Sequence, residues 1–362
     1  MRTADTVCLL APLPAPEELT DGYCRRIDSI DSLLPEPFIR IYLMGDRPQF
    51  MKILAEKRDE RHYYLQFNSA SLFQRQQIFS LIRRSGRLYI HSVYRFVAGP
   101  VSARMLRALS LPGVKILWDV HGAVPEEIEQ GGDLPIAQRA ADAEKALYEK
   151  SSVIICVTKT MVDHLRNKYG EPKARMLVLP ILPEMGERSF VQAPPILPEK
   201  PTVVYAGGLQ SWQCVGDMIA LMNRTWDRYD YRIYTPDPGA LTAQWGPGEG
   251  KDHVFIASAA QEEMEKAYQG CRYGLLLRND TAVNRVAFPT KLIEYISYGI
   301  VPVLKTAAIG VIEELGLGYI TAEALEKGEL PSEADRRATA ENNCRILQKE
   351  AETIRHRAEE IF

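Results

Sequence analysis

The sequence predicts an α/β protein built of two doubly wound, Rossmann-like domains, and three observations support this fold class. Short apolar runs alternate with amphipathic stretches through most of the chain, a pattern typical of parallel sheets covered by helices on both faces. A proline-rich stretch interrupts this alternation once. The length of 362 residues also exceeds what one hydrophobic core usually serves. We expect a ligand to bind in a cleft between the two domains, where the carboxyl ends of the strands face each other.

The first domain is expected to cover residues 1–185. Its predicted strands are Thr6–Ala11, Ile39–Met44, Tyr63–Phe67, Leu88–Ser92, Lys115–Asp119, Val153–Thr158 and Met176–Leu182. Its predicted helices are Gly22–Leu34, Leu72–Arg84, Val101–Leu109, Ile136–Lys150 and Met161–Tyr169.

Residues 186–201 hold four prolines and show no periodicity, which predicts a semi-rigid linker. The second domain, residues 202–331, resumes the alternation. Its predicted strands are Thr202–Ala206, Tyr231–Thr235, His253–Ala257, Tyr273–Leu277 and Val301–Leu304. Its predicted helices are Gly216–Thr225, Ala260–Gln269 and Thr290–Tyr298. Residues 332–362 mix charged with spaced apolar side chains, so we expect a long polar helix that packs back on the first domain.

The stretch from Arg278 to Leu304 is the most informative part of the chain. It is expected to join two strands through a polar loop and one short helix. Pro289 favours a helix start, where its missing N–H is not needed, and Gly299 favours the helix end. Because a helix N-terminus attracts phosphate, Pro289 and Thr290 are candidate phosphate-binding residues.

Three cations and one carboxylate accompany this predicted helix start. Arg278, Arg285 and Lys291 are side chains of the kind that pairs with phosphate. Glu294 lies one turn further along, where its carboxylate would accept hydrogen bonds from the two hydroxyls of a ribose. An ordinary crossover whose charges are only solvated is the alternative.

A glycine pair, Gly207 and Gly208, follows the first predicted strand of the second domain. Glycines there let backbone amides approach a phosphate, although a tight turn without a ligand has the same sequence. Trp212 and Trp245 would stack on a base or sugar, or else belong to the core. The chain lacks G-x-G-x-x-G and G-x-x-x-x-G-K-[ST], which argues against a dinucleotide dehydrogenase and a P-loop NTPase.

His121 follows a predicted strand of the first domain in the sequence W-D-V-H-G. Active sites of α/β proteins lie at the carboxyl ends of strands, and a histidine there exchanges hydrogen bonds or a proton with a substrate near neutral pH. Asp119 and Glu126 lie close to it in sequence and are candidates for binding an acceptor. A histidine with a purely structural role is the alternative.

Gly22, Tyr23 and Arg26 follow the first predicted strand of the chain. They offer a flexible turn and a cation at a helix start, which suits acceptor binding. An ordinary helix capped by Asp21 explains the same residues.

Charge and cysteine usage indicate the partners and the compartment. The segment from Arg61 to Trp118 holds nine Lys or Arg residues and no Asp or Glu, which suggests a membrane surface or a phosphorylated acceptor as anionic partner. The alternative is that these side chains are scattered over several faces of the folded protein. We expect no nucleic-acid partner. The six cysteines form no C-x-x-C pair, and no run is apolar and long enough for a signal peptide or a membrane span. A cytoplasmic protein, at the inner face of the plasma membrane, is expected.

Other reaction classes lack their signatures. No D-x-D motif and no set of residues with zinc-ligand spacing occur, so no metal site is expected. The G-x-S-x-G elbow of serine hydrolases is also absent.

These motifs resemble those of the retaining GT-B glycosyltransferases, in particular the large group that includes bacterial polysaccharide and lipopolysaccharide enzymes. The resemblance covers most of the chain. It is carried by Y-A-G-G-L-Q-S-W at 205–212, F-P-T-K-L-I-E-Y-I-S-Y-G-I-V-P-V at 288–303, W-D-V-H-G-A-V-P-E-E at 118–127 and V-I-I-C-V-T-K-T-M at 153–161.

The resemblance implies a nucleotide-sugar donor in the second domain and a saccharide or lipid-linked acceptor in the first. Glu294 would hold the ribose, and Lys291 with the Gly207–Gly208 turn would serve the diphosphate. His121 would contact the transferred sugar, and Arg278 with Lys291 would stabilise the leaving group. The nucleotide sugar would be the co-substrate, and the enzyme would need no metal and no further cofactor. Helix dipoles and cations would stabilise the leaving diphosphate instead.

Two departures from the family pattern stand out. Many relatives carry a second glutamate where this chain has Val286, and an arginine and a lysine where it has Gln210 and Gln213. Two other functions therefore remain open. One is a nucleotide-sugar epimerase of the same fold, and the other is a non-catalytic subunit that binds a nucleotide or a partner.

Overall fold

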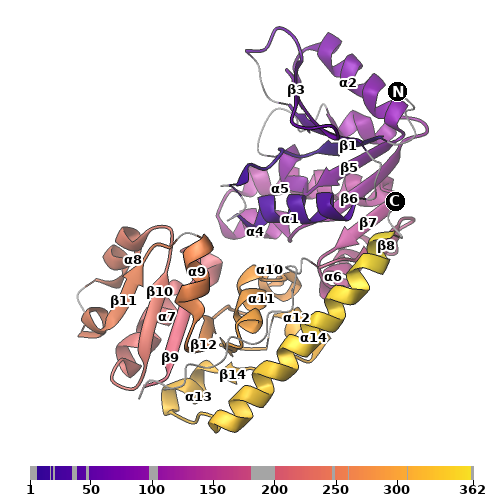
Figure 1. Ribbon diagram of the computed structural model, residues 1–362. Coiled ribbons are helices and arrows are strands. Elements are labelled where there is room, and N and C mark those ends of the chain that lie inside the picture. Colours follow the sequence, from indigo (N-terminus) through magenta and orange to yellow (C-terminus); the bar gives the residue numbers. More distant parts are fainter. Residues whose placement is uncertain are drawn as a thin grey trace. The chain divides into compact units, whose positions relative to one another are not determined.

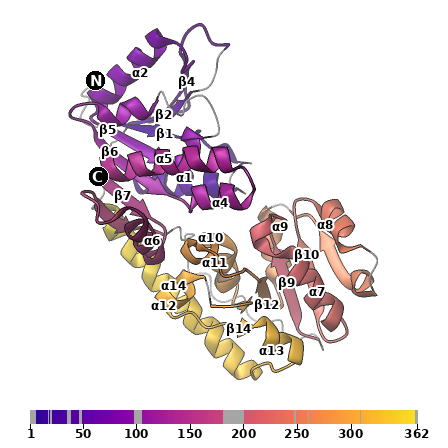
Figure 2. The same ribbon diagram turned by 180° about the vertical axis from the view of Figure 1, so that it is seen from behind.

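The computed structural model describes residues 6–16, 18, 21–34, 39–45, 49–97, 105–180, 200–246, 249–259, 261–307 and 309–359. The chain divides into two compact units (Figures 1 and 2). The N-terminal unit comprises Met1–Ile181 and Ile354–Phe362, and the C-terminal unit comprises Leu182–Thr353. Most of the predicted linker lies outside the described residues, which resume at Lys200.

An eight-stranded sheet forms the centre of the N-terminal unit, in the order β3-β4-β2-β1-β5-β6-β7-β8. Its strands are β1 (Thr6–Leu10), β2 (Ile39–Met44), β3 (Leu54–Lys57), β4 (His62–Gln66), β5 (Arg87–His91), β6 (Lys115–Val120), β7 (Val153–Cys156) and β8 (Arg175–Val178). All neighbours are parallel except β3, which pairs antiparallel with β4. The sequence did not predict β3. All four of its residues are exposed, so it shows no apolar run.

The helices of this unit are α1 (Gly22–Leu33), α2 (Leu72–Ser85), α4 (Val124–Gln130), α5 (Leu134–Lys150) and α6 (Lys159–Tyr169). The prediction of an α-helix over Val101–Leu109 is wrong where the chain is described. Leu106–Ser110 form a 3₁₀ helix, and residues 101–104 lie outside the described part. Helix α4 was not predicted because it has only seven residues.

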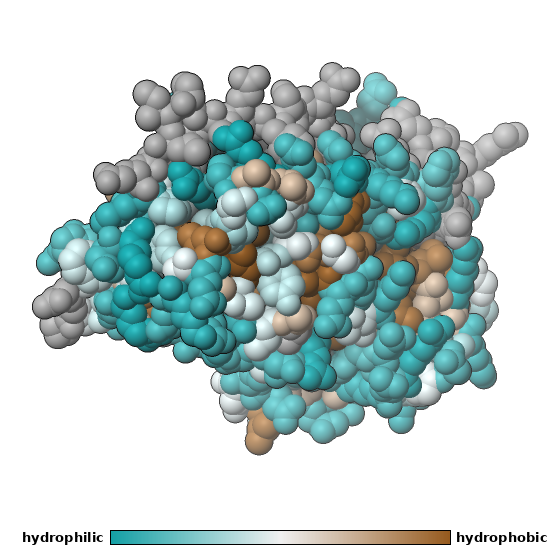
Figure 3. Space-filling model, turned by 90° about the horizontal axis from the view of Figure 1, so that it is seen from below, coloured by the Kyte–Doolittle hydropathy of each residue, from teal (hydrophilic) through white to brown (hydrophobic). Residues whose placement is uncertain are grey.

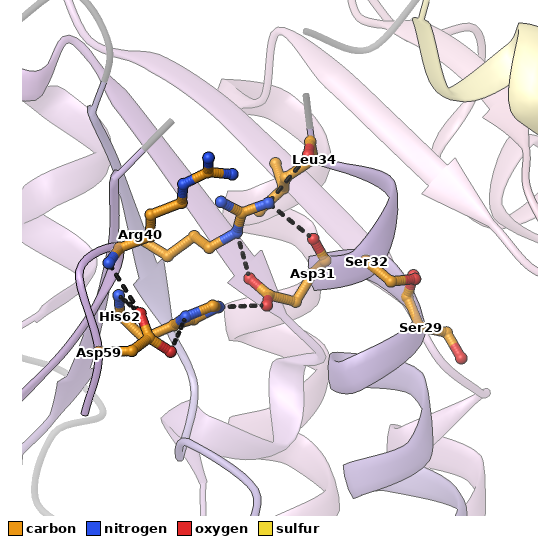
Figure 4. A network of polar contacts seen from close by, with 8 residues as sticks. Ser29, Asp31, Ser32, Leu34, Arg40, Asp59 and His62 are labelled. Atoms are coloured by element: carbon orange, nitrogen blue, oxygen red, sulfur yellow. Dashed lines mark hydrogen bonds and ion pairs between the residues drawn. The ribbon is translucent and has the colours of Figure 1, made fainter. Parts of the chain in front are cut away.

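A cluster of polar side chains joins the amino ends of β2 and β4 to the end of α1 (Figure 4). The two ring nitrogens of His62 lie 2.7 Å from Asp31 and 2.7 Å from Asp59. The Nε of Arg40 lies 2.9 Å from the Asp31 carboxylate. These contacts hold the β3–β4 hairpin against the rest of the sheet. They lie at the edge opposite the carboxyl ends of the strands.

A parallel six-stranded sheet forms the C-terminal unit, in the order β11-β10-β9-β12-β13-β14. Its strands are β9 (Thr202–Ala206), β10 (Asp230–Tyr234), β11 (Val254–Ala257), β12 (Cys271–Leu276), β13 (Val301–Leu304) and β14 (Ile320–Thr321). Its helices are α7 (Val215–Thr225), α8 (Pro238–Trp245), α9 (Gln261–Tyr268), α10 (Ala282–Val286), α11 (Thr290–Ser297), α12 (Gly310–Leu315) and α13 (Ala322–Lys327). Trp245 is buried in this core, as expected of an ordinary α/β domain.

Helix α14 (Glu333–Glu359) is the long terminal helix (Figure 1). Ala340, Cys344 and Leu347 belong to the core of the C-terminal unit. Its last turns belong to the N-terminal unit, where Arg357 Nη1 donates to the carbonyl of Val178 at 3.4 Å.

The surface drawn in Figure 3 is mainly hydrophilic, with small hydrophobic areas between polar side chains. Within the described ranges, no helix combines the length and the apolar character needed to cross a bilayer. All six cysteines are buried and none forms a disulfide.

Candidate active site

Helix α11 begins where the sequence placed a helix start. Pro289 is its N-cap, with φ −69° and ψ 124°, one position before the predicted first turn. Gly299 has φ +69° just after the helix, a left-handed conformation that favours glycine. Leu292, Ile293, Tyr295 and Ile296 are buried, so the amphipathic pattern anchors the helix to the sheet. Its first amides, of Thr290 and Lys291, lie at the positive end of the helix dipole.

Lys291 lies directly against the glycine turn that follows β9. A Cβ atom at Gly207 would come within 2.0 Å of Lys291 Cε and 2.1 Å of its Nζ, so only glycine permits this contact. Gly207 also has φ +145°. The structure therefore brings together two motifs that are more than eighty residues apart in sequence, and both were predicted to serve a diphosphate.

Two further side chains hold the Lys291 amine in place. Its Nζ donates to the Tyr205 hydroxyl at 3.0 Å and to Gln213 Oε1 at 3.1 Å. The same Nζ lies 4.3 Å from the centre of the Tyr205 ring, which adds a cation–π attraction. Neither Tyr205 nor Gln213 was predicted as a site residue.

Burial and, to a smaller extent, the positive charge of Arg278 lower the pKa of Lys291 to about 7, and Glu294 acts in the opposite direction. Arg278 is itself buried. A buried amine beside a guanidinium carries a penalty for its charge, and an anion placed between them would remove it. The arrangement of Arg278 and Lys291 thus favours an anionic ligand.

Glu294 faces Tyr268, the last residue of α9. The Tyr268 hydroxyl donates to Glu294 Oε2 at 2.8 Å, and Tyr268 is almost fully buried. A carboxylate has about four acceptor positions, so this bond orients Glu294 and leaves acceptor capacity for another donor. The sequence did not predict Tyr268.

The positions that depart from the family pattern have defined places. Val286 is buried in α10 and offers no polar atom. The Gln210 side chain lies against Gly208, where an added Cβ would meet its Oε1 at 2.4 Å. Arg285 is exposed and forms a two-pronged ion pair with Asp280. The phosphate role predicted for Arg285 therefore requires that it leave Asp280.

In the N-terminal unit, Arg26 and Asp119 form a buried ion pair. Arg26 Nη2 lies 2.8 Å from Asp119 Oδ1, Nε lies 3.0 Å from Oδ2, and Nη1 donates to the Leu179 carbonyl at 2.6 Å. Burial opposes the charge of Asp119, but Arg26 and the neighbouring histidines hold its pKa well below the usual value. The exposed fractions are 1% for Arg26 and 0% for Asp119. Both were predicted to bind an acceptor, and the structure instead makes them internal supports.

His121 lies beside this pair, just after β6. Its Nε2 is 3.4 Å from Asp119 Oδ2 and 3.2 Å from Nδ1 of His91, the last residue of β5. Tyr23 follows Gly22 at the start of α1. Its ring lies 5.1 Å from the His121 ring. Two of the predicted residues, Tyr23 and His121, are thus brought together at the carboxyl end of the sheet. His91 was not predicted.

His91, Asp119 and His121 form the one group within the described ranges whose atoms are spaced to hold a metal ion. Their nearest polar atoms are 3.2 to 3.5 Å apart. Two features disfavour a metal. The buried guanidinium of Arg26 already bonds both Asp119 oxygens. The outer nitrogens of both histidines have no acceptor among the described residues, whereas such acceptors usually orient metal ligands.

Glu126, on α4, belongs to a separate network. Its Oε1 accepts from Lys168 Nζ at 2.8 Å and lies 3.2 Å from His164 Nε2. Burial would raise the pKa of Glu126, but hydrogen bonds from His164 and Lys168 lower it to about 2. Lys168 also bonds Glu144 at 2.7 Å. Glu126 was predicted to bind an acceptor. In the structure it belongs to a network that links α4, α5 and α6.

The basic segment does not form one continuous element. Within the described residues its cations lie on α2, β5, β6 and two 3₁₀ helices and just before β4, and Arg75 is buried. Arg83 and Arg84 are exposed at the end of α2. The structure favours the alternative in which these charges are spread over several elements.

Residues 43–181 match the family model of Glycosyltransferase Family 4. No curated protein sequence matches the chain. Among solved structures, sucrose-phosphate synthase from Thermosynechococcus elongatus gives a TM-score of 0.70 at 13% identity, covering 99% of this chain and 98% of that one. HepE from Anabaena, in complex with UDP-glucose, gives 0.70 at 12%, covering 98% of each. The trehalose-6-phosphate synthase OtsA gives 0.64 at 14%, covering 98% and 97%. At these identities the likeness shows that the chain has the same fold as these proteins.

Proposed function

We propose that this chain, a GT-B protein of the glycosyltransferase family 4 type, is a retaining glycosyltransferase that moves a sugar from a nucleotide-diphosphate donor to a saccharide or lipid-linked acceptor. Cell-surface polysaccharide assembly is the proposed setting. One observation carries the donor assignment. The buried amine of Lys291 lies against the Gly207 turn, beside the amino end of α11 and one turn from Glu294.

Each donor group has a matching part in this arrangement. Lys291 and Arg278 supply positive charge for the diphosphate, and the first amides of α11 add hydrogen-bond donors. Glu294, oriented by Tyr268, accepts from the ribose hydroxyls. UDP-sugars are the first donors to test. HepE was solved with UDP-glucose, and a similar trehalose-6-phosphate protein from E. coli was solved with UDP-2-fluoro glucose.

The chemical step divides between the two units. Lys291 and Arg278 stabilise the charge that develops on the leaving diphosphate, the kind of electrostatic contribution that is often the largest in catalysis. His121 hydrogen-bonds the transferred sugar, and the buried Arg26–Asp119 pair keeps its surroundings rigid.

A turnover assay tests this proposal. The expected result is that a UDP-sugar releases UDP only when a suitable acceptor is present. Conversion of the sugar without an acceptor would indicate an epimerase. UDP binding with no turnover across a panel of donors and acceptors would indicate a non-catalytic subunit.

Replacing Glu294 by alanine is expected to weaken UDP binding by about 1.5–3 kcal/mol, the value of hydrogen bonds to a charged group. This corresponds to roughly 10- to 150-fold in Kd by calorimetry. Glu313→Ala, at an exposed position of α12, is the matched control and should bind normally. Unchanged affinity in Glu294→Ala would remove this residue from the site.

Metal removal is expected to leave activity intact, because the proposed leaving-group stabilisation uses Lys291, Arg278 and helix amides. The measurement is the initial rate after dialysis against EDTA, compared with the rate after adding back Mg²⁺, Mn²⁺ or Zn²⁺. Loss of activity that a specific metal restores would contradict this mechanism.

We also propose peripheral contact with an anionic membrane surface from the cytoplasmic side, with the exposed Arg83 and Arg84 among the contacting cations. The expected result is sedimentation with anionic vesicles that weakens as salt rises. Binding that salt does not change, or equal binding to neutral vesicles, would contradict it.

A further inference from the structure

His91 is the side chain of the candidate site with the least obvious purpose. It is fully buried at the end of β5. Its Nδ1 lies 3.2 Å from His121 Nε2 and 3.5 Å from Asp119 Oδ2. Its other ring nitrogen, Nε2, is buried and has no hydrogen-bond partner among the described residues.

His91 is neutral at physiological pH. Burial, with smaller contributions from His121 and Arg26, lowers its pKa to about 4, and Asp119 acts in the opposite direction. A neutral imidazole carries one proton, either on Nδ1 or on Nε2. The position of that proton decides what His91 offers to His121.

The surroundings favour the proton on Nδ1. In either tautomer Nε2 is buried without a hydrogen-bond partner among the described residues, so the groups facing Nδ1 decide between the two. A proton on Nε2 would leave the Nδ1 lone pair turned toward the negative carboxylate of Asp119. On Nδ1 it faces the negative charge of Asp119 and the ring nitrogen of His121. Two tyrosines also lie near His91. The ring of Tyr89 is 4.6 Å from the His91 ring, and the Tyr23 hydroxyl donates to the His91 backbone carbonyl at 3.4 Å.

A proton on His91 Nδ1 sets the state of His121. His121 Nε2 must then accept this hydrogen bond, so a neutral His121 carries its own proton on Nδ1. That atom has no hydrogen-bond partner among the described residues, and the His121 side chain is 12% exposed. The Nδ1 atom itself is buried, so the exposed part of the ring lies elsewhere. Nδ1–H is therefore a donor without a partner, which a substrate oxygen would satisfy once the ring turns toward it.

We propose that His91 is a positioning residue that fixes His121 as its Nδ1–H tautomer, so that His121 donates a hydrogen bond to an oxygen of the sugar substrate. Without His91, the His121 Nε2 would instead donate to Asp119 Oδ2, 3.4 Å away. His121 would then present an acceptor in place of a donor. The identity of the substrate rests on the proposed function, but the tautomer does not.

Nitrogen NMR on protein labelled with ¹⁵N-histidine tests the tautomer directly, with His91→Leu and His121→Ala assigning the signals. In the unmodified protein at pH 8, His91 and His121 should both be protonated on Nδ1 only. In His91→Leu, the His121 proton should move to Nε2. His91→Asn should keep it on Nδ1, because the asparagine amide donates from nearly the same place.

Three results would overturn the proposal. One is a His121 proton on Nε2 in the unmodified protein. Another is an unchanged His121 tautomer in a folded His91→Leu variant. The third is a His91 proton on Nε2 together with a bound metal, since a metal on these atoms requires the facing nitrogens to be deprotonated. The first and third need no variant, so they apply even if His91→Leu fails to fold.

Activity provides a second and separate measurement. His91→Leu should lower kcat roughly 10- to 100-fold, within the range of hydrogen-bonding and proton-transfer groups, while the donor KM stays nearly constant. His91→Asn should recover part of kcat. Equal losses in both variants would contradict the positioning role. No activity in any form, together with the predicted NMR result, would instead count against the proposed function alone.

Discussion

Lys291→Met is expected to weaken UDP binding about 10- to 150-fold, because a charge-assisted contact to the diphosphate is worth roughly 1.5–3 kcal/mol. The fold should tolerate the change. Burial lowers the pKa of Lys291 to about 7, so its charge is costly in the free protein. An unbranched apolar side chain fills the same space against Gly207 and Tyr205.

The pH dependence has a definite sign. The pKa of Lys291 in the folded chain, about 7, is below that of an ordinary lysine, so the unfolded chain binds more protons between these values. Stability should therefore rise with pH from about 7 upward, and below pH 7 the penalty is fully present. UDP affinity should change in the opposite direction and fall as pH rises above 7, since the diphosphate prefers the protonated amine.

Calorimetry at pH 6.5 and 8.5, in buffers of different ionisation enthalpy, measures the affinity and the proton uptake together. Lys327→Met is the control, since Lys327 is exposed on α13. This variant should keep the UDP affinity and the proton uptake of the unmodified protein. A Lys291→Met protein that binds UDP normally would remove Lys291 from the donor site. One that unfolds at pH 7 would show that the lysine is needed for the fold.

His121→Ala is expected to lower kcat by about 10²-fold or more, in the range found for side chains that act in the transition state, with little change in UDP affinity. The reason is that UDP contacts only the C-terminal unit in this proposal, whereas His121 belongs to the N-terminal unit. Steady-state kinetics and calorimetry on the same preparation separate the two effects.

The matched control is His253→Ala, in which the removed ring stacks on Trp226 in the C-terminal unit. It should leave kcat unchanged. Equal losses of turnover and of UDP affinity in His121→Ala would mean that this histidine supports the structure and does not act on the sugar.

The sequence predicted the fold well because its buried strands are continuous apolar runs. The strands β2, β9 and β13 were predicted residue for residue, and likeness to solved structures confirms the GT-B fold. Elements without such runs were missed. All residues of β3 are exposed, and α10 has five residues, too few to show a helical period.

The candidate site was predicted only where a local motif marked it. Lys291, Glu294 and the glycine turn were identified from the helix start and the βα turn. Tyr205, Gln213 and Tyr268 were missed because their contacts with α11 join residues 26 to 86 positions apart, which no local pattern reveals.

The N-terminal residues show the same limit. Arg26 was assigned to an acceptor because it follows the first predicted strand, and Asp119 because it ends a predicted strand beside His121. Their partnership across 93 positions buries both. His91 had one signal that was available in the sequence. It is a polar residue that ends an apolar strand. The next strand of the sheet carries Asp119, and His121 follows directly after that strand.

A crystal structure with UDP bound would locate the donor site. We expect the diphosphate within hydrogen-bonding distance of Lys291 Nζ and of the backbone amides at Gly207 and Thr290, with the ribose hydroxyls on the Glu294 carboxylate. A nucleotide bound elsewhere, with Lys291 still held by Tyr205 and Gln213 and with no ribose hydroxyl on Glu294, would show that this is not the donor site.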